Sequence, residues 1–133
     1  MLAVIFIAGT ALTFYVYNFV KETNLNSLAR GAQTIASSID VSEITNLKGS
    51  EDDLENPAYI SLKAKMQRIQ AVEEDVEFVY ITGQTEEGQF FFYGDSEDPE
   101  SEDYSPPGQI YDEADQSFND AFDTGEPNVT GPT

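Results

Sequence analysis

A long uncharged run at the start of the chain constrains the protein most. Leu2–Val20 contains no charged side chain, and a helix needs about 20 predominantly apolar residues to cross a bilayer. Tyr15, Tyr17 and Phe19 gather at the far end of the run, where an aromatic belt would lie, and a lysine comes directly after it. The sequence therefore predicts a retained transmembrane helix over residues 1–20.

Two alternatives to this anchor are a cleaved signal peptide and a buried core helix. A signal peptide would have basic residues before a shorter apolar core and small residues at a cleavage site, and this run shows none of these. Basic residues are too few for the positive-inside rule to give the orientation.

The anchor is succeeded by an amphipathic pattern. Leu25, Leu28, Ala32, Ile35 and Ile39 recur at steps of three and four, which is a heptad seam. We therefore expect the helix to continue beyond the membrane to about Ile39. Its stripe can pack on the protein's own sheet or pair two protomers, and two heptads do not decide between these. A homodimer through this N-terminal helix is the expected assembly.

Composition excludes several classes of function. The formal net charge is -19, from 25 acidic and 6 basic residues, so nucleic acid is not an expected partner. The chain has no His and no Cys, which removes Ser-His-Asp and Cys-His catalysis and the usual transition-metal ligands. We predict no enzyme activity, cofactor or metal for this chain. An acidic surface can attract cations or simply keep the protein hydrated.

The rest of the chain predicts an α+β fold. Asn56 is a good N-cap and Pro57 suits the first position of a helix that runs to about Ala71. The other predicted elements are a strand over Val76–Thr82, a loop over Gly83–Gly88, a strand over Gln89–Asp95, and a helix over Tyr111–Thr124 with Gly125 as its cap. Because both strands are apolar on both faces, the sheet should be covered twice, once by the long amphipathic helix. Two strands alone make a marginal sheet, so we expect an incomplete antiparallel sheet in a chain cut inside its domain.

An acidic stretch, DSEDPESEDYSPPG, occupies residues 95–108. Five of its carboxylates could hold calcium: Asp95, Asp98, Glu100, Glu102 and Asp103. Their spacing does not match a calcium loop, and a solvated loop is the favoured interpretation. The Tyr-Ser-Pro-Pro-Gly end is stiff and is expected to position the predicted helix after it.

Six short segments, taken in order, carry a resemblance to a known family. They are Leu47-Lys-Gly-Ser, Asn56-Pro-Ala-Tyr-Ile-Ser-Leu-Lys63, Phe78-Val-Tyr-Ile-Thr82, Asp95-Ser-Glu, Asp103-Tyr-Ser-Pro-Pro-Gly108 and Gly125-Glu-Pro-Asn-Val-Thr-Gly-Pro132. Together they resemble the extracytoplasmic Cache (PAS-like) sensor domain of prokaryotic membrane receptors, such as histidine kinases and diguanylate cyclases. The resemblance implies that residues 21–133 are the first part of such a domain, that residues after about 21 lie outside the cytoplasm at the cell membrane, and that the C-terminal strands are missing.

The resemblance also implies a ligand site. In such domains a small molecule binds between one sheet face and the segment that crosses it after the second strand, here Ser96–Thr124. The candidate pocket residues are Tyr80, Phe91, Tyr93, Tyr104 and Tyr111, because aromatic walls with hydroxyl groups are usual in small-molecule sites. The alternative is that these side chains only pack the core and the crossing segment. The competing function is an acidic, membrane-anchored surface protein that binds cations or a protein partner.

Overall fold

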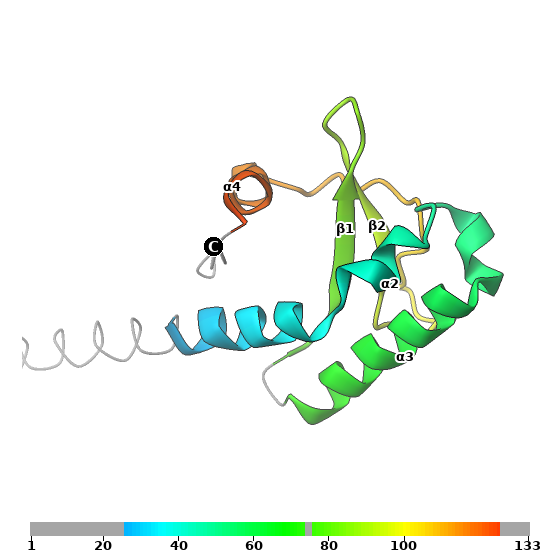
Figure 1. Cartoon of the computed structure of the whole chain (residues 1–133), viewed down its shortest axis with the longest axis horizontal. Coiled ribbons are helices and arrows are strands. Elements are labelled where there is room, and N and C mark those ends of the chain that lie inside the picture. The colour runs from blue at the N-terminus through cyan, green and yellow to red at the C-terminus, as the bar shows by residue number, and fades with distance from the viewer. Residues whose placement is uncertain (1–25, 74–75, 126–133) are drawn as a thin grey trace, which may run out of the picture. The chain divides into compact units, whose positions relative to one another are not determined.

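A computed structural model describes residues 26–73 and 76–125 (Figure 1). The described residues fall into two units, one formed by residues 38–115 and the other by residues 26–37 and 116–125. The predicted transmembrane helix over residues 1–20 lies outside the described residues. Within the described ranges, no helix combines the length and the apolar character needed to cross a bilayer.

The described residues form a mixed α+β fold with a two-stranded antiparallel sheet. Residues 26–38 are helical, as the heptad pattern predicts. The later elements are α2 (Val41–Thr45), the 3₁₀ helix η1 (Glu51–Glu55), α3 (Pro57–Val72), β1 (Tyr80–Gln84), β2 (Phe90–Asp95) and α4 (Gln116–Thr124).

The helix α3 begins and ends close to its predicted limits. The Asn56 side chain accepts a hydrogen bond of 2.9 Å from the Ala58 backbone N–H, and Pro57 occupies the first turn. This side chain replaces one of the partners that the first turn of a helix lacks. On the inner side of α3, Tyr59, Leu62 and Met66 are 3% exposed or less and form the centre of the core.

The first strand is shifted along the chain relative to its prediction. It starts at Tyr80 rather than at position 76, because the Val79 backbone N–H donates to the Ser96 hydroxyl, 3.0 Å away, instead of to a strand carbonyl. It continues through Gly83, which the sequence assigned to the loop, since the Phe91 and Tyr93 rings fill the space where a side chain would stand. The hairpin loop is therefore shorter and closes with a 2.8 Å hydrogen bond from the Thr85 N–H to the Gln89 carbonyl.

The last helix also starts later than predicted, at Gln116 rather than at Tyr111. The Tyr111 N–H donates to the Phe90 carbonyl at 2.8 Å, and Ile110 forms a bridge with Phe91, so the chain at these residues is held along the sheet edge. The predicted C-terminal cap of α4 is confirmed, because the Gly125 N–H donates to the Ala121 carbonyl at a positive φ of 67°.

Residues 104–111, which we call the strap, lie along the edge of β2 that β1 leaves open. The Gly108 N–H donates to the Phe92 carbonyl at 2.8 Å, and the Phe92 N–H donates to the Gln109 carbonyl at 2.9 Å. Pro107 is fully buried. The expectation that residues 96–124 cross a sheet face is therefore wrong for residues 104–111, which are hydrogen-bonded to the edge of the sheet.

Candidate functional site: an aromatic cluster and a polar latch

The structure distributes the five predicted site residues over three places in the unit 38–115. Tyr80 and Tyr111 lie together, Phe91 and Tyr93 lie together on the other sheet face, and Tyr104 lies against α3. The sheet register explains why Tyr80 lies on a different face from Phe91 and Tyr93. Gly94 faces Tyr59 of α3 and pairs with Ile81, so the neighbouring Tyr80 points to the opposite face.

The aromatic cluster consists of Tyr80 from β1, Phe92 from β2 and Tyr111 from the strap. The ring centroid of Tyr80 lies 5.6 Å from that of Phe92 and 6.0 Å from that of Tyr111, and the centroids of Phe92 and Tyr111 are 5.1 Å apart. These are ordinary distances for edge-to-face aromatic contacts. Three segments thus each supply one ring to the sheet face that points away from α3.

The two tyrosines give this apolar cluster its polar groups. Tyr80 is 40% exposed and Tyr111 is half-buried, whereas Phe92 between them is buried. Burial raises the pKa of Tyr80 to about 12, and the nearby Tyr111, also hydrogen-bonded to it, adds to the shift. Both causes favour the neutral phenol. The cluster therefore presents phenol hydroxyl groups beside an apolar ring.

Phe91 and Tyr93 occupy a more confined position. Their ring centroids are 4.9 Å apart. A Cβ at Gly83 would lie 2.6 Å from Phe91 and 2.7 Å from Tyr93, and a Cβ at Gly49 would lie 2.4 Å from Phe91. These rings are packed directly against two glycine backbones, and both side chains are half-buried.

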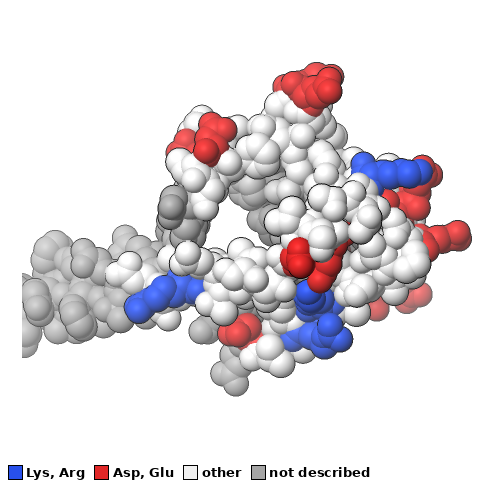
Figure 2. All heavy atoms as spheres, in the orientation of Figure 1, with Lys and Arg blue, Asp and Glu red and all other residues white. Residues whose placement is uncertain are grey.

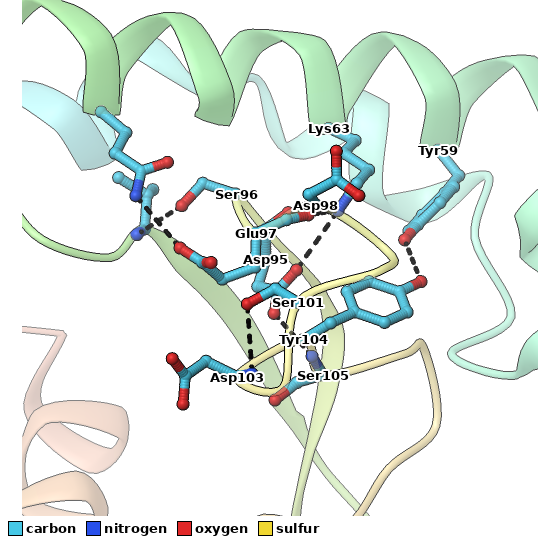
Figure 3. A network of polar contacts seen from close by, with 12 residues as sticks. Tyr59, Lys63, Asp95, Ser96, Glu97, Asp98, Ser101, Asp103, Tyr104 and Ser105 are labelled. Carbon is cyan, nitrogen blue, oxygen red and sulfur yellow. Dashed lines mark hydrogen bonds and ion pairs between the residues drawn. The ribbon is translucent and has the colours of Figure 1, made fainter.

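A polar latch joins α3 to Asp95 and Tyr104 of the acidic stretch (Figure 3). It consists of Tyr59 and Lys63 on α3, Asp95 at the end of β2, and Tyr104 at the start of the strap. The Lys63 ammonium lies 3.3 Å from Asp95 Oδ1 and 4.7 Å from the centroid of the Tyr104 ring. The Tyr59 and Tyr104 hydroxyl oxygens are 3.1 Å apart.

The Lys63 ammonium and the Asp95 carboxylate are both largely buried, and both are hydrogen-bonded. The Lys63 and Asp95 side chains are 12% and 6% exposed. Lys63 also donates to the backbone carbonyls of Asp95 and Glu97, and the second oxygen of Asp95 accepts from the Ser105 N–H at 2.7 Å. Burial raises the pKa of Tyr59, and the hydrogen bond to Tyr104 adds to the effect. A buried ion pair with this number of hydrogen bonds fixes a chain path, because its members have few other partners of equal quality.

The middle of the acidic stretch has a different environment. Asp98 and Asp103 are exposed, and Asp98 accepts from the Glu100 N–H at 2.9 Å within its own turn. Over the described ranges, no group of three or more carboxylates is arranged to hold a metal ion. Other exposed acids, Glu86 and Glu87, occupy the tip of the hairpin loop, where Figure 2 shows a separate acidic patch.

A surface hollow also borders the strap. Its lining residues are Gly49, Ser50, Glu51, Pro106, Pro107, Gly108 and Gln109. Gly108, at φ 92°, approaches the chain so closely that a Cβ there would lie 3.0 Å from the Gly49 carbonyl oxygen. None of the five predicted site residues lines this hollow.

The sequence prediction missed Phe92, Tyr59 and Lys63. Strand alternation alone would not have found Phe92, because it groups Phe92 with Gly94, and the register shift at Tyr93 places these two residues on opposite faces of the sheet. Lys63 carried a weaker signal, namely that α3 holds three of the chain's six basic residues and no acidic residue. No family model, curated protein or solved structure matches the chain.

Proposed function

We propose that this chain is the extracytoplasmic ligand-sensing part of a membrane-bound signal-transduction receptor, of the sensor histidine kinase or diguanylate cyclase type. The observation that carries the proposal is the aromatic cluster, in which Tyr80, Phe92 and Tyr111 come from three segments and meet on one face of the sheet. Apolar rings with a few convergent hydroxyl groups are the usual lining of a small-molecule site.

In this proposal the apolar run at the start of the chain is the membrane anchor, and the helical residues 26–38 connect it to the sensing unit. The seam of that helix pairs two protomers. A small molecule that binds the cluster contacts β1, β2 and the strap together, because each contributes one ring. Binding signals only if the ligand prefers one of two arrangements of these segments, and a shift of about 1–2 Å at a helix interface is typical of such switches.

The test uses the 133-residue chain reconstituted in lipid nanodiscs. Amino acids, dicarboxylates, purines and amines serve as the probes, and binding is measured by calorimetry and by the shift in melting temperature. We expect at least one probe to bind with 1:1 stoichiometry, and we expect Tyr80→Phe and Tyr111→Phe to weaken it. Tyr93→Phe, on the opposite face of the sheet, is the matched control and should bind as the wild type does.

Two results would count against the proposal. Binding that is equally strong in Tyr80→Phe, Tyr111→Phe and Tyr93→Phe would remove the aromatic cluster from the site. Saturable binding of divalent cations alone, insensitive to all three changes, would favour the acidic surface protein that binds cations or a protein partner.

A further inference from the structure

The helix α3 carries lysines on both flanks of its buried side. At 100° per residue, Lys63 and Lys65 project to opposite sides of the stripe formed by Tyr59, Leu62 and Met66. Because the stripe and both lysines belong to one helix, the two lysines can hold two different parts of the chain against the same rigid element.

Lys63 holds the start of the acidic stretch and, through the latch, the strap. Its ammonium group has three acceptors, namely the Asp95 carboxylate and the backbone carbonyls of Asp95 and Glu97. These equal the three N–H donors of the group. Tyr104 covers the ammonium with its ring and bonds to Tyr59 of the same helix. Two of the three acceptors are backbone atoms, so Lys63 fixes the path of the chain where it leaves β2.

Lys65 holds the end of the helical residues 26–38. It donates to the Ser38 carbonyl at 3.2 Å and forms an ion pair of 2.7 Å with Glu43 of α2. The Lys65 and Glu43 side chains are only 27% and 32% exposed. Asp40, between the two helices, accepts from the Ser42 N–H at 2.9 Å and so caps α2. The last carbonyl of the helical residues 26–38 is therefore bound to the same element as the strap.

We propose that α3 couples the strap to Ser38, where the helical residues 26–38 end, with Lys63 and Lys65 as its two positioning residues. A displacement of the strap at Tyr104 moves α3 through Lys63 and Tyr59, and α3 then moves Ser38 through Lys65. This inference rests on the proposed sensing function, since it describes how an event at Tyr111, seven residues along the same strap from Tyr104, reaches the helix.

Hydrogen exchange of the 133-residue chain in nanodiscs, read by mass spectrometry without any ligand, tests this coupling. The strap is reported by the amides of Ser105, Gly108 and Tyr111, and the helix end by the amides of residues 36–45. The variants are Lys63→Met, Lys65→Met and the double change. Lys48→Met is the control, because it removes an exposed ion pair to Asp52 with side chains 71% and 73% exposed.

We expect Lys63→Met to speed exchange in the strap and at the helix end, each by roughly tenfold, the size of effect that loss of a charge-assisted hydrogen bond has on a local opening. Lys65→Met should speed exchange at the helix end by a similar factor. The double change should add little at the helix end to either single change, because both break the same path. Lys48→Met should leave both regions at the wild-type rate.

Faster exchange in the strap alone for Lys63→Met would overturn the coupling, and so would full additivity in the double variant. If Lys63→Met unfolds the unit, Tyr104→Phe replaces it, because this change removes one hydroxyl group and keeps the ion pair. If exchange in Tyr104→Phe became faster in the strap alone, that result would also overturn the coupling. Since no ligand is present, failure of this test leaves the ligand-binding proposal standing, and failure of the binding test leaves this one standing.

Discussion

The two faces of the β1–β2 hairpin differ in how they are filled. On one face, α3 places Tyr59 and Met66 directly over Gly94, and the Phe91 and Tyr93 rings close over Gly83. On the other face, Tyr80, Phe92 and Tyr111 contact one another, and Tyr80 is 40% exposed. On the first face, large side chains fill the space beside the glycine backbones. On the second face, the partly exposed Tyr80 ring has surface that another molecule can contact.

The difference also extends to the polar groups of each face. On the α3 side the polar atoms are bound within the latch, where Lys63, Asp95 and Tyr104 satisfy one another. On the other side the phenols of Tyr80 and Tyr111 are the polar groups of the cluster. The α3 side is thus built for holding the chain in place, and the aromatic side is the one we assign to recognition. Four sets of substitutions test this division.

The largest effect is expected for the latch. Asp95→Ala leaves the Lys63 ammonium buried without its carboxylate and leaves the Ser105 N–H without an acceptor. Removing one member of a buried ion pair typically costs about 3–5 kcal/mol, which is a large share of the roughly 5–15 kcal/mol that stabilises a domain. Urea denaturation should show this loss. Asp52→Ala, in the exposed pair with Lys48, should cost at most about 1 kcal/mol, and equal losses would show that the latch is no stronger than a surface pair.

A core substitution on the same side should have the next largest effect. Leu62 is fully buried in α3, whereas Ile60, two residues before it, is 56% exposed. Leu62→Ala should lower the free energy of unfolding by about 2–5 kcal/mol through lost burial and a cavity. Ile60→Ala should change it by about 0.5 kcal/mol or less. A comparable loss in the two variants, measured by denaturation, would mean that α3 is not packed by this face.

Local sequence signals predicted α3 well and the strands less well. The helix is defined by groups close in sequence, since Asn56 caps it and Pro57 starts it. The first strand begins late for a non-local reason, because Val79 is bound to the Ser96 hydroxyl and the Glu77 carbonyl is taken by Gln70 of α3. Such partners cannot be read from strand propensity.

The candidate site was predicted only in part, and the reason is again an arrangement that local sequence does not show. Tyr80 and Tyr111 were both expected in the pocket, and the structure brings them together. Tyr93 is the extra residue where the register shifts, between the pairs Ile81–Gly94 and Thr82–Phe92. A bulge changes which side chains share a face, and nothing in the sequence marks its position. Phe92 therefore takes the place in the cluster that was predicted for its neighbours.

Glycine substitutions probe how closely the strap is fixed to the latch side. Gly108 and Gly88 both have positive φ, 92° and 86°, but only at Gly108 would a Cβ meet other atoms, 3.0 Å from the Gly49 carbonyl oxygen. Gly88→Ala should therefore measure the backbone strain alone, about 1–2 kcal/mol. Gly108→Ala should cost more, about 2–3 kcal/mol, because the strain and the contact add. Equal losses in thermal denaturation would indicate that the strap can move away from Gly49 without cost.

The smallest effect, on the aromatic side, is the alkaline titration of Tyr80. Its pKa in the folded chain is raised from 10.0 to about 12, chiefly by burial. Below pH 10 Tyr80 is neutral in the folded and unfolded states alike, so its contribution to stability is fully present. Between pH 10 and 12 the unfolded chain loses this proton first, and stability falls as the pH rises.

Ultraviolet absorbance of phenolate in wild type minus Tyr80→Phe should isolate one transition near pH 12 among the seven tyrosines. Tyr59→Phe, on the α3 side, should remove a transition at still higher pH, because burial raises the pKa of Tyr59 further. A Tyr80 transition near pH 10, its ordinary value, would mean that the cluster is open to water, and the two sides would then differ even more sharply than we propose.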